Sequence, residues 1–385
     1  MSEWKKVRLG EIANYVNEKI DIKAFDTSLY ISTDSMLKDK GGIGTPESIP
    51  ESGKVTKYQH NDILVSNIRP YFKKIWFSNR EGGCSNDVLV FRANDNIDST
   101  FLYYVLSDDS FFDHIMSSAN GTKMPRGNRK LIPSFEINLP PLSTQHRIAT
   151  ILSRYDSLIE NYQKQIKLLE EAAQRLYKEW FIDLHFPGHE NTNIIDGVPE
   201  GWEKKSIGEI GEYLNGFAFK PSDWQDLGKP IIKIKEMGNG VTNETPRNSG
   251  ERVPAKYLIK TGDLLFSWSA TLMVIIWSGE EGWLNQHLFK VTPVKGIDRE
   301  FLLQSISNTI VEFQNLTTGS TMKHIQRNKL NQVFVNVPNA EIMKRYSDIS
   351  EKTRSNILSL QSQLRLLTEA RDRLLPKLMS GDIEI

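Results

Sequence analysis

Two short polar segments, at equivalent places in the two halves of the chain, carry side chains suited to nucleic-acid contact. They span 121–130 and 319–329, and neither contains a carboxylate. Arg and Lys can pair with phosphates or guanine edges, while Asn and Gln match the donor and acceptor pair of adenine. A solvated basic loop is the alternative, and recurrence in both halves favours contact. The candidate residues are Lys123, Arg126, Asn128, Arg129, Ser320, Lys323, His324, Gln326, Arg327 and Asn328.

A second pair of candidate segments follows a repeated Asp-apolar-Ser pattern, residues 62–66 and 263–267. The first continues with mixed basic and aromatic residues, whereas the second continues without a basic residue. Different side chains on an equivalent scaffold would read different bases, although the aromatic residues could equally belong to the core. The candidates are Asn67, Arg69, Tyr71, Lys73, Lys74, Ser267, Trp268 and Ser269.

Catalytic motifs are missing from the chain. It has neither a GxxxxGK[ST] phosphate loop nor an HExxH zinc helix. The sequence NLPP at 138–141 has the wrong order for the Asn/Asp-Pro-Pro-aromatic clamp of a base-amine methyltransferase. A nuclease-like Asp196 with residues 203–205 (EKK) is a combination common by chance. Seven histidines without paired spacing and a single cysteine predict no metal site.

The elements that must position these segments come in two copies, about 198 residues apart. Trp4 and the sequence LGEI at 9–12 return as Trp202 and IGEI at 207–210. The sequence INLP at 137–140 returns as VNVP at 335–338. Because this period is far longer than that of a solenoid or propeller, it predicts the tandem duplication of a whole domain.

Each half ends in a segment with heptad spacing. Between Ile148 and Trp180, apolar residues alternate by four and three positions, which keeps one stripe aligned along a helix. The equivalent stripe from Tyr346 to Leu378 has polar exceptions at Ser350, Thr353 and Arg371. We expect the two helices to pair antiparallel. A stripe packed only on its own domain, or a coiled coil with another chain, is the alternative.

Strand-like runs such as 87–91 and 287–291 precede each helix and complete an α+β chain with pseudo-two-fold symmetry. The expected organisation is a first globular domain at 1–141, a central long helix at 142–186, a linker at 187–198, a second globular domain at 199–339 and a C-terminal long helix at 340–380.

The composition is that of an ordinary globular protein. Lys plus Arg and Asp plus Glu both number 48, which argues against a histone-like polyanion binder but not against local basic patches. The single Cys84 and the lack of a signal-like start fit a cytoplasmic protein. The longest apolar run, 272–277, is too short for a membrane span, which needs about 20 residues.

Four motifs resemble the specificity subunit of type I restriction-modification enzymes. They are PPLSTQHRI at 140–148, LYKEWFIDL at 176–184, VPEGW at 198–202 and LLPKLMSGDI at 374–383, and together they span nearly the whole chain. The sequence NAEI at 339–342 departs from the Pro-Leu-x-x-Gln that opens the first helix.

The resemblance implies two target recognition domains, each reading half of a bipartite site on double-stranded DNA. The helix pair would set the length of the unread spacer between the two half-sites. The resemblance also implies two methyltransferase subunits, which bring S-adenosylmethionine and flip the target adenine, and restriction subunits, which use ATP and magnesium. The chain itself would be non-catalytic.

Two other classes of function remain as hypotheses. A coiled-coil scaffold or adaptor with two protein-binding domains and no DNA readout is compatible with the neutral charge. A methyltransferase or nuclease contained in this chain is opposed by the missing motifs.

Overall fold

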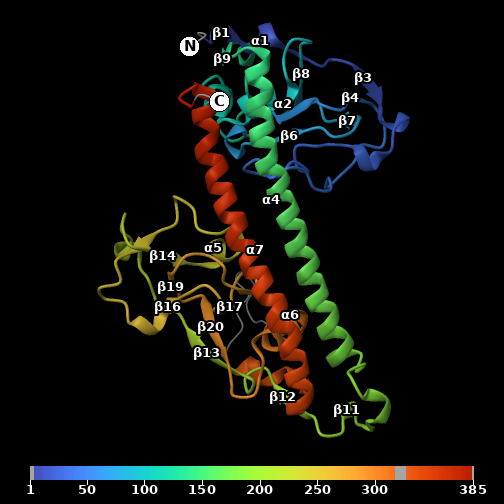
Figure 1. The fold of residues 1–385 in the computed structure, drawn as a ribbon, viewed down its shortest axis with the longest axis vertical. Coiled ribbons are helices and arrows are strands. Elements are labelled where there is room, and N and C mark those ends of the chain that lie inside the picture. Colours follow the sequence, from blue (N-terminus) through green and yellow to red (C-terminus); the bar gives the residue numbers. More distant parts are fainter. Residues whose placement is uncertain (1–3, 317–326, 384–385) are drawn as a thin grey trace. The chain divides into compact units, whose positions relative to one another are not determined.

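The structure is a computed structural model that describes residues 4–316 and 327–383 (Figure 1). The chain forms two compact units. Unit 1 consists of Met1–Glu160 with Leu366–Ile385, and unit 2 consists of Asn161–Arg365. Each unit therefore combines one globular half with parts of both long helices. No helix of the described residues is long and apolar enough to cross a membrane.

Unit 1 contains antiparallel sheets. The central sheet has the order β2 (Ala13–Tyr15), β8 (Val88–Ala93), β5 (Ile63–Ser66), β6 (Ile75–Phe77). A second sheet has the order β3 (Lys19–Asp21), β4 (Lys54–Tyr58), β7 (Gly82–Cys84), and a separate pair joins β1 (Lys5–Arg8) to β9 (Glu136–Leu139). Residues in β5 and β8 are buried on both faces, in runs of continuous apolar residues.

Helices close the core of unit 1. After the short α1 (Leu9–Ile12), α2 (Ser99–Ser107) and α3 (Asp109–Ser117) pack in the same apolar cluster as residues of β5 and β8. The Asp98 side chain caps α2 by accepting a hydrogen bond from the Phe101 amide at 2.8 Å. The ring centroids of Phe111 and Phe91 lie 6.2 Å apart, which joins α3 to β8.

Unit 2 repeats the topology of the central sheet, whereas its second sheet has four strands and includes one parallel pair. Its central sheet has the order β13 (Gly211–Asn215), β20 (Leu288–Pro293), β17 (Leu264–Ser267), β18 (Met273–Ile276). The second sheet has the order β15 (Arg247–Asn248), β14 (Lys229–Ile232), β19 (Gly282–Leu284), β16 (Leu258–Ile259). The remaining elements are the strand pairs β12 (Glu203–Ser206) with β21 (Phe334–Val337) and β10 (Ile194–Ile195) with β11 (Val198–Pro199), and the helices α5 (Ile234–Asn239) and α6 (Arg299–Asn315).

The strand registers show the duplication residue by residue. Lys5 faces Leu139 in the first half, and Glu203 faces Val337 in the second. The repeated Glu closes the same turn in each copy, because Glu11 accepts a hydrogen bond from the Arg8 amide at 3.1 Å and Glu209 accepts one from the Ser206 amide at 2.8 Å. The repeated sequence motif is thus a repeated turn.

The two long helices are α4 (Leu142–Tyr177) and α7 (Ala340–Ser380). α4 ends before residue 186, where the sequence predicted its end, because the chain passes into a π-helical turn, η5 (Lys178–Ile182). This turn carries the Trp180 and Phe181 rings into the core of unit 2, where the Phe181 centroid lies 5.8 Å from that of Trp202 and 4.9 Å from that of Tyr346.

The two helix starts use different hydrogen bonds. Gln145 is buried; its amide nitrogen donates to the Pro140 carbonyl at 3.0 Å, and its oxygen accepts from the Asp98 amide at 3.1 Å. The second helix lacks this Gln, and Asn339 caps it by accepting from the Ile342 amide at 3.0 Å. The second helix therefore begins with a side-chain cap from Asn339, where the first helix begins with the two hydrogen bonds of Gln145.

Polar exceptions in the second heptad stripe have partners. Ser350 donates to the Asp298 carboxylate at 3.1 Å in unit 2. In unit 1, Arg371 of α7 binds Asp156 of α4 at 2.8 Å, and the Tyr104 hydroxyl donates to the other oxygen of Asp156 at 2.6 Å. Burial beside this carboxylate raises the pKa of Tyr104, so its hydroxyl remains a donor. In unit 1 the two helices run in opposite directions, since Arg371 binds Asp156 while Leu375 and Leu378, further along α7, share a cluster with Ile148 and Leu152, which come earlier in α4.

We expect Arg371→Ala to lower the free energy of unfolding by about 1.5–3 kcal/mol, because it removes charge-assisted hydrogen bonds and leaves Asp156 with the Tyr104 hydroxyl alone. Urea denaturation measures the change. Arg373→Ala, on the exposed side of the same helix, is the control. Equal effects of the two substitutions would show that the ion pair adds nothing to stability.

Candidate nucleic-acid interface

Three segments of unit 1 form one continuous surface. The Gly127 amide donates to the Asn67 carbonyl at 3.2 Å, and the Arg69 amide donates to the Pro125 carbonyl at 2.8 Å. The Lys40 amide donates to the Lys73 carbonyl at 3.0 Å. Backbone hydrogen bonds therefore join the two loops that the sequence singled out separately, 66–74 and 121–130, and add a third around residues 38–40. We call these three segments the unit 1 loop surface.

The exposed candidates on this surface are aromatic and basic. Tyr71 is 46% exposed, and Lys123, Arg126 and Arg129 are also exposed. Arg126 pairs with Asp87 at 3.2 Å, and the Arg129 guanidinium carbon lies 5.6 Å from the centroid of the Tyr15 ring. These side chains are accessible from solvent, and their contact with phosphates or base edges stays a prediction.

Other candidates on the same surface are buried or have side chains that bind the backbone of the protein. Asn67 is 7% exposed, and its side-chain oxygen lacks a hydrogen-bond partner among the described residues. Lys74 donates to the Thr33 carbonyl at 2.6 Å, and burial together with the nearby cations Lys38 and Arg69 lowers its pKa. The Asn128 oxygen accepts from the Lys130 amide at 3.1 Å and fixes the turn.

The turn that carries Tyr71 has an unusual backbone. It is the 3₁₀ turn η3 (Pro70–Phe72), flanked by Arg69 with φ 50° and Lys73 with φ 48°. Non-glycine residues rarely adopt this left-handed conformation, and such positions cluster at functional sites. Its amide contacts to the neighbouring loops hold it in place.

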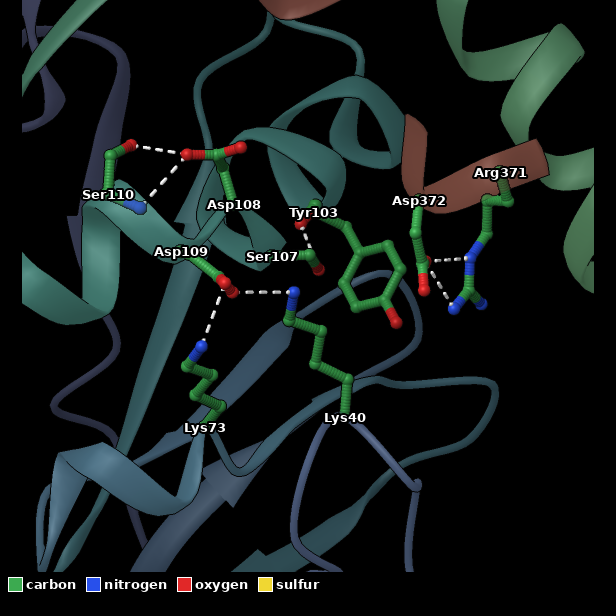
Figure 2. A network of polar contacts seen from close by, with 9 residues as sticks. All are labelled: Lys40, Lys73, Tyr103, Ser107, Asp108, Asp109, Ser110, Arg371 and Asp372. Atoms are coloured by element: carbon green, nitrogen blue, oxygen red, sulfur yellow. Dashed lines mark hydrogen bonds and ion pairs between the residues drawn. The ribbon is translucent and has the colours of Figure 1, made fainter. Parts of the chain in front are cut away.

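Sequence reasoning missed Lys38 and Lys40. The Lys38 ammonium lies 4.1 Å from the Phe72 ring centroid, and Lys40 forms an ion pair with Asp109 at 3.0 Å. Lys73 binds the other oxygen of the same carboxylate at 2.8 Å, as Figure 2 shows. Two lysines beside a Gly-Gly pair were the available signal, but nothing in the sequence indicated which loop they would join.

In unit 2, the residues predicted after β17 are largely internal. Ser267 is fully buried; its hydroxyl donates to the Thr271 carbonyl and accepts from the Met273 amide at 2.9 Å. Ser269 is 3% exposed and lies 3.2 Å from His287 Nδ1, and Trp268 donates to the Asn215 side chain at 3.0 Å. These side chains organise the turn rather than present free polar groups to a ligand.

The second polar loop of unit 2 lies mostly outside the described residues, among them Ser320, Lys323, His324 and Gln326. Arg327 and Asn328 are described, and both are exposed at the start of η9 (Arg327–Gln332). DNA contact by all these residues stays a prediction.

The repeated Asp-apolar-Ser pattern is structural in both halves. Asp62 is buried and accepts two hydrogen bonds from Arg92 of β8, at 2.7 and 2.8 Å. Asp263 pairs with Lys290 of β20 at 2.7 Å. In each copy the carboxylate therefore joins the beginning of one central strand to a cation on its neighbour.

Comparisons with known proteins give the family. The family model named Type I restriction modification DNA specificity domain matches residues 1–171 and 199–364. The chain therefore belongs to the type I restriction-modification DNA specificity family.

Within the described residues, no group of three or more His, Cys, Asp or Glu side chains could hold a metal ion.

Individual relatives cover much or all of the chain. It is 25% identical over 465 aligned positions to the type I restriction enzyme HindI specificity subunit of Haemophilus influenzae, with 100% of both chains covered. It is 25% identical over 310 residues to the MjaIX specificity subunit of Methanocaldococcus jannaschii, covering 76% of this chain and 70% of that one. The type I restriction-modification S subunit from M. genitalium has a similar fold, with a TM-score of 0.60, 17% identity and coverage of 98% and 96%.

We expect Ser267→Ala to lower the free energy of unfolding by about 1–2 kcal/mol, because the Met273 amide loses its side-chain acceptor. Sequence preference on DNA should not change, since this hydroxyl is buried. Denaturation and a DNA-selectivity assay on the same variant make the test, with the exposed Ser222→Ala as control. A change of preferred sequence with unchanged stability would contradict it.

Proposed function

We propose that this chain gives a type I restriction-modification complex its DNA sequence specificity, with each half reading one half of a bipartite target. The observation that carries the proposal is a duplicated scaffold bearing different loops. The central sheets of the two units share one topology, whereas lysine and arginine residues follow β5 and no lysine or arginine follows β17 before residue 290. Two domains with the same central sheet and different loops are suited to bind two different DNA half-sites.

On the unit 1 loop surface, lysines and arginines would set the register on the phosphates. Lys123 and Arg126 are exposed cations, and such side chains position a protein on a duplex without reading sequence. Arg129 and Tyr71 are exposed groups of the kind that can contact base edges or sugars. In unit 2, Arg327 and Asn328 would take part.

The long helices would act as the spacer and as the docking site for two methyltransferase subunits. The 41 residues of α7 extend over roughly 60 Å, and half-sites on one face of a duplex lie about 34 Å apart. α4 exposes Leu158 at 45% and Leu168 at 55%, apolar side chains of the kind that partner subunits bury.

Catalysis would come from those partners and not from this chain. The methyltransferase subunits would bring S-adenosylmethionine and flip the adenine, and the restriction subunits would use ATP and magnesium, all in the cytoplasm. This chain would contribute the choice of sequence and no reacting group.

Co-expression with the cognate methyltransferase subunit, followed by mapping of N6-methyladenine on a plasmid, tests the proposal. We expect a two-part motif with a fixed unread spacer. Exchange of residues 1–141 for those of another specificity subunit should change one half of the motif only. A stable complex whose methylation has no sequence preference would refute the proposal and favour a scaffold.

Single substitutions should separate the two kinds of contact. Lys123→Gln is expected to weaken cognate and non-cognate DNA equally and to reduce the salt dependence by about one phosphate contact, whereas Arg129→Ala should relax one base position at about 1–3 kcal/mol. Titrations at several salt concentrations measure both. Lys54→Gln, an exposed charge on β4, is the control. Unchanged affinity and preference in both loop variants would show that these loops do not touch DNA.

A further inference from the structure

One carboxylate neutralises two lysines of the unit 1 loop surface. Asp109 binds Lys40 through Oδ1 at 3.0 Å and Lys73 through Oδ2 at 2.8 Å. Figure 2 shows both ammonium groups converging on it from separate loops. The two lysine side chains are 30% and 31% exposed, so each remains partly accessible to a ligand from solvent.

The anion is well stabilised where it lies. Asp109 is the first residue of α3, next to Asp108, which caps this helix by accepting from the Ser110 amide at 2.9 Å. A helix N-terminus favours negative charge. Partial burial opposes ionisation of Asp109, but the hydrogen bonds from Lys73 and Lys40 outweigh it and hold its pKa below the ordinary value. Asp109 is therefore an anion at neutral pH.

The loops do not depend on Asp109 for their backbone positions. The Lys40 amide donates to the Lys73 carbonyl at 3.0 Å, and the Asp39 amide donates to the Phe72 carbonyl at 2.9 Å. Within the turn, the Lys73 amide donates to the Pro70 carbonyl at 2.8 Å. Removal of the carboxylate should therefore leave both lysines in place and change their electrostatic environment.

We propose that Asp109 is an internal competitor for DNA phosphate that limits the sequence-independent affinity of the first half. A carboxylate held between two ammonium groups occupies the place that a backbone phosphate would take. Each phosphate that gains a cation adds a salt-dependent contribution that is the same for every sequence. Non-cognate DNA is in large excess in a cell. A lower sequence-independent affinity for DNA therefore leaves more of the complex free to bind its target. The inference rests on the proposed function.

The test uses the complex with its methyltransferase subunit and compares Asp109→Asn with Asp113→Asn. Asp113 is exposed one turn further along α3, and it forms no ion pair in the described part of the chain, so it matches the charge change. Binding of cognate and non-cognate duplexes is titrated over a range of salt concentrations. Thermal unfolding of each variant checks the fold.

For Asp109→Asn we expect both duplexes to bind roughly tenfold more tightly, with a salt dependence steeper by one to two phosphate contacts. Methylation of the target should become more sensitive to competitor DNA. Asp113→Asn should resemble the wild type. Adding Lys40→Gln and Lys73→Gln to Asp109→Asn should abolish the gain, since those lysines supply it.

Other outcomes overturn the inference in distinguishable ways. If Asp109→Asn weakens binding while the fold is intact, the carboxylate orients the lysines and does not compete with phosphate. If it matches Asp113→Asn while the wild type still methylates one bipartite sequence, Asp109 has no effect on DNA and the proposed function stands. If the wild type shows no sequence preference, the proposed function and the inference both fail.

Discussion

Each globular half closes its core with helix segments that are distant in the sequence. In unit 1, Ile148 and Leu152 of α4 and Leu375 and Leu378 of α7 are buried in the same cluster as the central sheet and α2. Burial of such a side chain is worth about 1.5–3 kcal/mol, so the four together weigh heavily against a net stability of about 5–15 kcal/mol. The fold of the first half is therefore incomplete without the last residues of the described chain, and unit 2 similarly buries Tyr177 with Tyr346.

Polar contacts within each unit fix the strands of its central sheet, whereas the loops after these strands differ between the two halves. Carboxylates at equivalent strand starts bind cations on the neighbouring strand, as Asp62 does with Arg92 and Asp263 with Lys290. Turns after those strands are closed by buried hydroxyls such as Ser267. The loops that follow these strands carry different side chains in the two halves, so the two halves present different surfaces.

Local charge matters more than total charge in this chain. Its 48 basic and 48 acidic residues cancel, yet cations converge on one surface of unit 1. Carboxylates oppose them from outside those loops: Asp109 on α3 faces Lys40 and Lys73, and Asp87 faces Arg126. The unit 1 loop surface therefore carries basic side chains in its loops, and carboxylates at its edge neutralise part of this charge.

The sequence by itself determined the duplication, the two heptad helices and the family, because these depend on periodicity and on ordered motifs within single segments. It also singled out loops 66–74 and 121–130. Only the tertiary structure decided that these loops join each other and the segment around Lys40, that Asn67 and Ser267 are buried, and that the π-helical turn ends α4 at Tyr177. The reason is physical: exposure and partnership depend on hydrogen bonds and packing between segments far apart in the chain, and no local pattern records which segments will meet.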